Sequence, residues 1–119
     1  NEKLNVEELK GVRLQIQVGE IHLDFMRNVD ITTIFTNLLD NGKEALRQVE
    51  GEKYLRLTVE EVRDFLLIDM ENTWNPRGEK TGHQGLGLKN VENALKTYHG
   101  TLRTEQRENI FHVNILIPL

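Results

Sequence analysis

The clearest pattern in the chain is a stripe of apolar side chains between residues 30 and 49 that recurs at steps of three and four. It comprises Ile31, Ile34, Phe35, Leu38, Ala45, Leu46 and Val49. That spacing predicts one helix whose apolar face contributes to the core. Asp30 precedes the stripe as an N-cap and Gly51 follows it, so we expect the helix to end near Val49.

Polar side chains recur along one border of the same stripe, at Asn37, Asn41, Glu44 and Gln48. Residues three and four apart share a helix face, so we expect these four to line a wall beside the core. Amide and carboxylate oxygens, including that of Asp40, suit Mg²⁺ shared with phosphate. Taken alone, this helix fits an ordinary amphipathic helix with solvated polar positions better than it fits a metal site.

Alternation of apolar and polar residues with period two predicts strands in the rest of the chain. The predicted strands cover residues 12–18, 21–25, 54–59, 62–70, 101–104 and 110–118. The third and fourth form one hairpin, the last two form another, and His22 lies on the surface of the short second strand. A second helix is predicted from Leu88 to Tyr98, where apolar residues again recur at helical spacing.

A long polar segment, residues 71–84, separates the fourth strand from the second helix and has no apolar periodicity. Such loops usually act as lids or binding loops. The run Gly85-Leu86-Gly87-Leu88 then leads into the helix, where free backbone N–H groups suit phosphate. This motif alone is weak. Asn90 replaces the third glycine of a Rossmann fingerprint, and Glu44 follows Gly42-Lys43 where a Walker A loop needs Ser or Thr.

Composition narrows the class of protein. A chain of 119 residues suits one domain, and 38% hydrophobic with 29% charged residues is ordinary for a soluble protein. The 15 Lys and Arg against 19 Asp and Glu give a net charge of −4, so we expect neither nucleic acid nor an anionic membrane as a partner. The absence of cysteine excludes disulfides and thiolate metal sites. No targeting segment and no membrane-spanning run of about 20 residues is present.

Several motifs together resemble the ATP-binding catalytic (GHKL, Bergerat-fold) domain of a sensor histidine kinase. They are NLLDNGKEAL at 37–46, MEN at 70–72, GLGLKNV at 85–91, YHGTL at 98–102 and FHVNILIP at 111–118. The resemblance covers nearly the whole chain from residue 11, keeps the order of the family's motifs, and is closest to the peptide-sensing and quorum-sensing branch. It implies an α/β fold, a two-layer sandwich of a mixed sheet with helices on one face and an ATP lid. Residues 1–10 are then a linker or the tail of a preceding helix, and residues 11–119 the domain.

The resemblance also implies roles for individual residues. In the N box it implies Asn37, Asn41 and Glu44 as catalytic residues, with Asn41 as the main Mg²⁺ ligand and Asn37 as a second. Glu44 stands where some family members have a phosphate-contacting lysine. The residues implied to contact ATP are Asn41, Asn72, Lys80, Thr81, Gly85, Leu86, Gly87, Leu88 and Lys89. Asn72 takes the place of the adenine-binding Asp, and the glycines that usually follow that Asp are missing.

The function implied is Mg-ATP binding and donation of the γ-phosphate to a histidine on a separate dimerisation domain, followed by transfer to a response regulator. His22, His83, His99 and His112 do not lie in a phosphoacceptor context, so we expect the fragment to bind ATP without autophosphorylating. The resemblance also implies a cytosolic domain of a membrane-anchored kinase, without direct membrane contact. Two alternatives remain: an anti-sigma-type serine kinase of the same fold, and a degenerate nucleotide-binding or docking module without catalysis.

Overall fold

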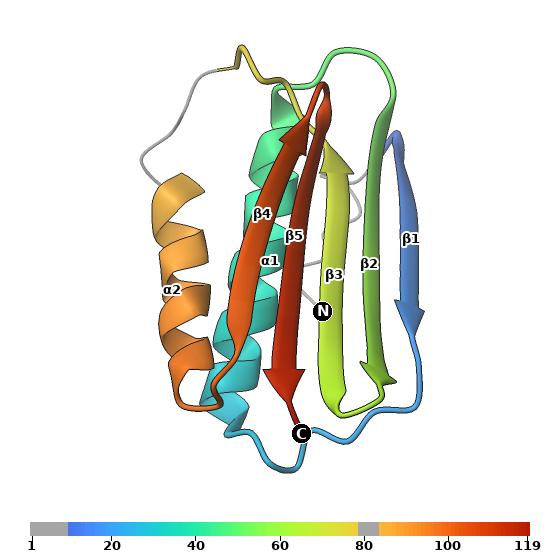
Figure 1. The fold of residues 1–119 in the computed structure, drawn as a ribbon. Coiled ribbons are helices and arrows are strands. Elements are labelled where there is room, and N and C mark those ends of the chain that lie inside the picture. Colours follow the sequence, from blue (N-terminus) through green and yellow to red (C-terminus); the bar gives the residue numbers. More distant parts are fainter. Residues whose placement is uncertain (1–9, 79–83) are drawn as a thin grey trace.

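The computed structural model describes residues 10–78 and 84–119, which form a five-stranded sheet with two helices on one face (Figure 1). The elements are β1 (Val12–Val18), α1 (Asn28–Arg47), β2 (Lys53–Val62), β3 (Phe65–Thr73), α2 (Gln84–Lys96), β4 (Thr101–Arg107) and β5 (Ile110–Pro118). The strand order is β1-β2-β3-β5-β4, with β1 parallel to β2 and all other pairs antiparallel. The predicted two-layer α/β sandwich with a mixed sheet is confirmed.

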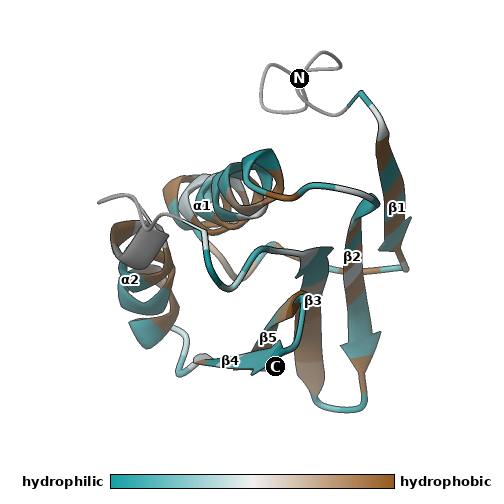
Figure 2. Ribbon diagram, turned by 90° about the horizontal axis from the view of Figure 1, so that it is seen from above, coloured by the Kyte–Doolittle hydropathy of each residue, from teal (hydrophilic) through white to brown (hydrophobic). Residues whose placement is uncertain are grey.

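The core lies between the sheet and the helices, because each central strand turns alternate residues towards α1 and α2. The fully or almost fully buried apolar residues are Ile34, Leu38, Leu46, Leu55, Leu57, Val59, Leu66, Ile68, Met70, Val91, Leu95, Val113, Ile115 and Ile117. Their period is two in the strands and three to four in the helices, which is the pattern that the sequence shows. We call this side of the sheet the helix face and the other side the open face (Figure 2).

Gly42 lets the middle of α1 approach the sheet. A Cβ atom built on Gly42 would lie 2.7 Å from Leu55 Cδ1 and 3.3 Å from Met70 Cε. A side chain at this position would therefore have to displace the ends of the Leu55 and Met70 side chains, so glycine permits the close packing of α1 on β2 and β3. Since Asn37 and Asn41 lie on the same helix, this close packing also fixes their distance from the sheet.

Residues 21–25 do not form the short strand that their alternation predicts. They belong to the segment that joins β1 to α1 across the end of the sheet (Figure 1), and Met26 N–H donates to Leu23 O in a turn. Ile21 and Leu23 pack against the core, and Phe25 contacts Tyr98 edge to face with the ring centres 5.9 Å apart. Apolar and polar residues alternate in this segment because every second side chain packs against the rest of the protein as the chain crosses the end of the sheet. His22 is consequently not a strand residue; its N–H and ring contact Glu61.

The helix ends differ from the prediction in two places. The N-cap of α1 is Arg27, which makes no side-chain cap hydrogen bond, and Asp30 lies inside the first turn, where it accepts a hydrogen bond from Tyr98 Oη. The start of α2 is Gln84, so Gly85 and Gly87 lie within the first helical turn rather than in a turn before it. The predicted α1 end near Val49 is within two residues of the observed end at Arg47.

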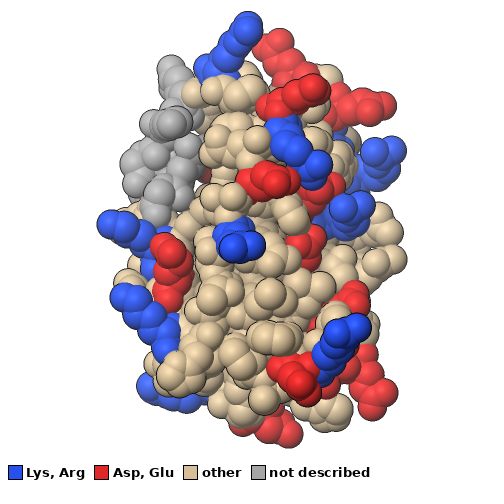
Figure 3. All heavy atoms as spheres, in the orientation of Figure 1, with Lys and Arg blue, Asp and Glu red and all other residues tan. Residues whose placement is uncertain are grey.

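The open face is polar, and its central side chains bind one another. Tyr54 Oη donates to Glu71 Oε1 (2.7 Å), which also accepts from Arg56 Nη2 (3.0 Å). Burial, together with the hydrogen bond to Glu71 and its charge, raises the pKa of Tyr54 to about 12, so the hydroxyl keeps its proton at neutral pH. Charges of both signs are interspersed over the upper part and the margins of this face, and its lower centre is uncharged (Figure 3).

A second group on the open face joins β3 to β5. His112 Nε2 and Asn114 Nδ2 both lie within hydrogen-bond distance of Asp69 Oδ1, at 2.6 and 3.0 Å. Like the group around Glu71, this one satisfies its polar atoms within the sheet itself. No helix among the described residues is long and apolar enough to cross a membrane.

Candidate functional site

The two helices run in opposite directions, and the last part of α1 extends beyond the start of α2 (Figure 1). At the lower end, Tyr98 Oη accepts from Arg27 N–H (3.0 Å) and donates to Asp30 Oδ2 (2.5 Å). The hydrogen bond to Asp30 raises the pKa of Tyr98. At the upper end of α2, a Cβ atom built on Gly87 would lie 3.6 Å from Asn37 Oδ1. The contact between α1 and α2 thus runs from the start of α1 to Asn37, and α1 continues beyond it.

The second half of α1 carries the polar wall predicted from the sequence. Asn41, Glu44 and Gln48 are half-buried along it. Residues 75–78, which follow β3, lie against its end, because Asn75 Nδ2 donates to Gln48 O (3.3 Å) and Gly78 N–H donates to Asn75 O (2.9 Å). A Cβ atom on Gly78 would collide with Gln48 Oε1. The wall therefore adjoins the segment after β3 at Gln48 and the start of α2 at Asn37.

Asn72 is the one fully buried polar side chain in the apolar core of the described residues, with 0% of its surface exposed. It lies on β3 opposite Leu55 and Phe111, on the helix face. Its Nδ2 donates to Thr73 O (2.9 Å), while Oδ1 is buried without a hydrogen-bond partner. A buried acceptor without a partner costs about 1–3 kcal/mol. Such an atom in a native protein calls for an explanation, and a ligand that donates a hydrogen bond is one.

The other residues implied by the resemblance lie around the start of α2 and along α1. Asn37 Nδ2 donates to Thr33 O (2.7 Å), which leaves Oδ1 on the side of Gly87. Glu44 forms an ion pair with Arg47 on the same helix. On α2, Leu86 and Lys89 are exposed.

Of the other residues that the resemblance implies, one lies at the core and others fall in or next to residues 79–83, which the structure does not describe. Leu88 is partly buried against the core. Lys80 and Thr81 lie outside the described residues, and of Gly85 only its place in the first turn of α2 is described. The structure therefore brings together Asn37 and Gly87 and places Asn41 and Glu44 further along α1. Asn72 is buried on β3, in the sheet that α1 packs against.

Trp74, which we place from the sequence inside the polar loop, lies instead at its root. Its backbone N–H donates to Asn109 O (2.9 Å), so the pairing of β3 with β5 extends by one residue to the turn between β4 and β5. Its ring contacts Phe111 at 5.4 Å between ring centres, and Nε1 is buried without a partner among the described residues. The loop after β3 thus begins at Asn75, where Asn75-Pro76-Arg77-Gly78 has the residue order typical of a β-turn. That turn signal was present in the sequence.

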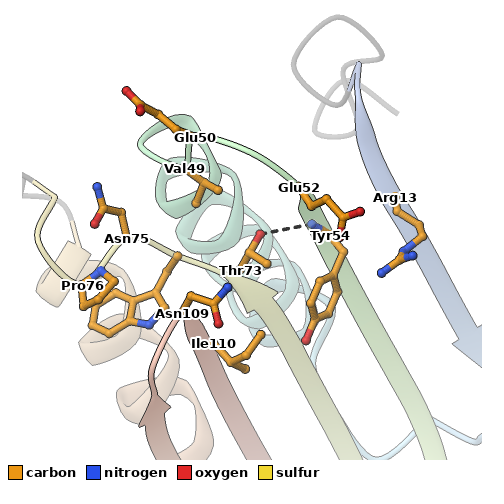
Figure 4. A pocket seen from close by; sticks show the side chains of 11 residues that line it. Arg13, Val49, Glu50, Glu52, Tyr54, Thr73, Asn75, Pro76, Asn109 and Ile110 are labelled. Atoms are coloured by element: carbon orange, nitrogen blue, oxygen red, sulfur yellow. Dashed lines mark hydrogen bonds between the residues drawn. The ribbon is translucent and has the colours of Figure 1, made fainter.

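A hollow of about 470 Å³ lies at the same end of the sheet (Figure 4). Its floor is formed on the open face by Arg13, Tyr54, Thr73 and Ile110, and its rim by Val49, Glu50, Glu52, Trp74, Asn75, Pro76 and Asn109. The Arg13 guanidinium lies 5.8 Å from the Tyr54 ring centre, and Thr73 Oγ1 accepts from Tyr54 N–H. The polar groups of its floor thus contact one another, in contrast to Asn72 Oδ1 on the opposite face.

The described residues contain no group of three or more His, Cys, Asp or Glu side chains that could hold a metal ion by themselves. The donor set at the wall of α1 is different in kind, since it consists of the amide oxygens of Asn37 and Asn41 with neighbouring carboxylates. Amide and carboxylate oxygens in small number are what Mg²⁺ accepts when substrate phosphates and waters complete its coordination. The residues present therefore fit a nucleotide-bound Mg²⁺ rather than a metal held by protein alone.

The three described histidines stand apart from the α1 wall. His22 contacts Glu61, and His112 pairs with Asp69 on the open face. His99 is exposed after α2 in a left-handed backbone conformation (φ 58°). His83 lies outside the described residues.

Comparison with known proteins assigns the fold. The catalytic domain of histidine kinase ThkA in a nucleotide-free form superposes with a TM-score of 0.74 at 18% identity, over 97% of this chain and 84% of that chain. The histidine kinase domain of the blue-light activated kinase EL346 from Erythrobacter litoralis gives 0.74 at 16% identity, over 92% of this chain but only 52% of that one. The Acinetobacter baumannii histidine kinase AdeS gives 0.70 at 17% identity, over 94% and 57%. This chain thus spans about half of EL346's kinase domain.

No curated protein sequence matches the chain. The description of the GHKL domain family matches residues 26–118, which is more than half of the chain and includes α1, the Asn72 end of β3 and the start of α2. At such low identity the similar structures show the fold, and the family match adds the relationship. The chain therefore belongs to the GHKL domain family.

Proposed function

We propose that this domain binds ATP with Mg²⁺ on the helix face, between α1, the end of β3 and the start of α2. The observation that carries the proposal is the buried, unpartnered Oδ1 of Asn72. Adenine presents an exocyclic amine, which is a hydrogen-bond donor, and Oδ1 is the half of the amide that can accept it, since Nδ2 is engaged with Thr73 O. A nucleotide would thus satisfy an atom that the fold leaves unpaired.

The phosphate end of the proposed site is at the start of α2. The first turn of a helix has backbone N–H groups without internal partners, and its dipole favours an anion. Gly87 lies in that turn against Asn37 and carries no side chain that would block the approach. Lys89, which is exposed two residues after Gly87 on α2, supplies positive charge near the phosphates. From the sequence, Lys80 and Thr81 are further candidates for contact with the phosphates.

Asn41 and Asn37 would hold Mg²⁺, which when bound neutralises phosphate charge and polarises the γ-phosphate. Phosphoryl transfer depends mainly on such positioning and charge neutralisation. The chain's own residues orient the nucleotide at both ends, Asn72 at the base and Asn37 with the start of α2 at the phosphates. Glu44, on the border of the wall, is the carboxylate that we assign to the attacking group; it forms an ion pair with Arg47 on the same helix.

The proposal extends to the whole protein. The phosphate acceptor would be a histidine on a separate dimerisation domain, and a response regulator would receive the phosphate next. We assign the domain to the cytosol, where ATP is available. The net charge of −4 and the interspersed charges of the open face support the absence of a nucleic-acid or membrane partner (Figure 3).

The experiment is a calorimetric titration of Mg-ADP into the parent chain and into Asn72→Leu. Leucine has a similar volume but no acceptor, so ADP affinity should fall by about tenfold to a hundredfold, as expected for 1–3 kcal/mol. Thermal melting should show Asn72→Leu close to the parent in stability, because removal of the unpaired buried Oδ1 offsets the loss of the hydrogen bond from Nδ2 to Thr73 O. Equal ADP affinity in a folded Asn72→Leu variant would remove Asn72 from the site. Absence of ADP binding to the folded parent would refute the proposal.

A further inference from the structure

The two edges of the sheet are protected very differently. In the strand order β1-β2-β3-β5-β4, the edge strands are β1 and β4. β4 carries Arg103, Glu105 and Arg107, and natural proteins use such charges to keep edge strands from pairing with other chains. β1, with the sequence VRLQIQV, has one charge in seven residues, and every residue from Arg13 to Val18 is exposed. By the same rule, and as far as residues 10–78 and 84–119 show, β1 is an unguarded edge.

The exposed side chains of β1 include a row of apolar residues. Leu14, Ile16 and Val18 are 39, 41 and 58% exposed. The register places them beside Leu55, Leu57 and Val59 of β2, which are buried on the helix face. They therefore point to the same side as the core, but Figure 2 shows that the two helices lie over the other strands and leave β1 uncovered. A row of this kind at a free edge marks a contact surface.

The sequence of β1 is self-complementary. Read from Gln15 outwards, Leu14 is matched by Ile16, and Val12 by Val18. If two copies of β1 pair antiparallel with Gln15 opposite Gln15, these residues come to lie directly opposite each other on the same face. Arg13 then lies opposite a glutamine, Gln17, so no like charges meet. A shift by one residue would place apolar opposite polar side chains on both strands, and a shift by two would leave residues at both strand ends unpaired, so the pairing centred on Gln15 matches the most residues.

We propose that β1 is a homotypic contact, at which a second copy of this chain adds its own β1 antiparallel, centred on Gln15. The pairing joins the two five-stranded sheets edge to edge and relates the copies by a two-fold axis. A two-fold axis through Gln15 perpendicular to the sheet keeps the helices of both copies on the same side. The row of Leu14, Ile16 and Val18 in each copy then packs beside the row of the other.

The strength of this contact follows from its size. Each Leu14–Ile16 and Val12–Val18 pair occurs twice, and a good cross-strand pair contributes roughly 0.2–1 kcal/mol. One seven-residue strand edge and four apolar side chains per copy form a smaller interface than the roughly 1,200–2,000 Å² of a stable complex. We therefore expect a weak, reversible dimer. The contact does not depend on nucleotide binding.

Cysteine cross-linking tests the register directly, because the chain has no cysteine of its own. At the two-fold axis, Gln15→Cys would face its own copy with Cβ atoms about 4.5–5.5 Å apart, close enough for a disulfide to form with a small adjustment. Gln17→Cys is the matched control, on the same strand and face but about 13 Å from its own copy along the strand. Under mild oxidation, Gln15→Cys should form a covalent dimer about tenfold faster or more, which corresponds to about 1.4 kcal/mol.

Two further arms separate the proposed pairing from random collision. A mixture of Arg13→Cys and Gln17→Cys chains should cross-link to each other faster than either does alone. Adding Val18→Lys to the Gln15→Cys chain should slow its cross-linking to the rate of Gln17→Cys, because a lysine blocks the edge. Thr104→Lys on β4 is the control for an added charge and should leave the rate unchanged. Circular dichroism of each variant establishes that it is folded.

The outcomes are exclusive. Faster cross-linking at position 15, together with the mixed pair and the effect of Val18→Lys, supports the proposal. Equal rates for Gln15→Cys and Gln17→Cys, or an unchanged rate with Val18→Lys in folded protein, would overturn it. In that case β1 would be left as a surface for another segment or for a different partner.

Discussion

The two faces of the sheet both carry polar side chains, but these differ in whether their polar atoms have hydrogen-bond partners. On the open face, Glu71 binds Tyr54 and Arg56, and Asp69 binds Asn114. On the helix face, Asn72 is buried among apolar residues and its Oδ1 has no partner. Networks whose members satisfy one another stabilise a fold, whereas an isolated unpaired acceptor costs free energy. The comparison supports the proposal that the ligand binds on the helix face, while the polar groups of the open face stabilise the sheet.

The same substitution at two asparagines, one on each face of the sheet, is the strongest test of this difference between the faces. Asn72→Leu should weaken Mg-ADP binding by about tenfold to a hundredfold with little change in stability. Asn114→Leu should do the reverse, because it removes a hydrogen bond to Asp69 (3.0 Å) and leaves nucleotide affinity unchanged. We expect Asn114→Leu to lower the free energy of unfolding by about 1–3 kcal/mol in urea titrations. If both variants lost affinity equally, the difference between the faces would have no functional meaning.

Gly87→Ala sharpens the account at the phosphate end. A Cβ atom at this position would be in ordinary contact with Asn37 Oδ1, at 3.6 Å, so the fold accommodates it. Alanine favours the helix by up to about 1 kcal/mol over glycine, so the melting temperature should rise slightly. The added methyl group narrows the approach to the first turn of α2, and ATP affinity should fall about tenfold, near the lower end of the cost of a lost partner. A rise in stability with unchanged affinity would place the phosphates elsewhere.

Asn41→Ala tests the metal. The side chain lies on the half-buried wall of α1, one turn after Asn37, which adjoins the start of α2. Its removal should abolish the Mg²⁺-dependent part of nucleotide affinity. The measurement is ADP affinity with Mg²⁺ and with chelator, in parent and variant. Binding in chelator should be the same in both proteins. A parent and variant with the same response to Mg²⁺ would contradict the assignment of Asn41.

The smallest effect concerns the open face at alkaline pH. The pKa of Tyr54 is about 12 in the folded protein and 10.0 for an ordinary tyrosine, so the unfolded chain loses the proton first. The contribution of Tyr54 to stability is then fully present below pH 10 and is lost as pH rises towards 12. Tyr54→Phe should lack this part of the alkaline loss, measured by urea unfolding between pH 9 and pH 11.5 relative to the parent. Tyr98 titrates in both proteins and serves as the common background.

Periodicity in the sequence was sufficient for most of the fold. Residues 12–18 match β1 in full, although residues 13–18 are exposed, because the apolar residues of β1 alternate in step with the buried ones of β2. The stripe in residues 30–49 corresponds to α1, where burial of one face sets the pattern. The alternation at 21–25 predicted a strand wrongly, since a crossing segment anchored by Ile21 and Leu23 produces the same pattern. The N-cap at Asp30 was also wrong: its carboxylate binds Tyr98, 68 residues away, a contact that no local rule contains.

The site was accessible to sequence reasoning only in part. The family motifs placed Asn37, Asn41 and Asn72 in the right elements, and the structure brings Asn37 beside Gly87. What the sequence does not contain is the state of Asn72: full burial and an unpaired oxygen result from packing between β3, its neighbours and α1. The docking of residue 78 against Gln48 likewise depends on tertiary structure, although the turn itself was recognisable.

The most direct test of nucleotide binding on the helix face uses the side-chain amide signals of Asn72 and Asn114 in the NMR spectrum of the ¹⁵N-labelled chain. The two groups lie on opposite faces of adjacent strands, β3 and β5, and single substitutions assign their signals. On saturation with Mg-ADP, the account predicts that the Asn72 Nδ2 signals shift strongly while those of Asn114 stay in place. Shifts at Asn114 with an unmoved Asn72 would contradict it, because the nucleotide would then be bound to the open face.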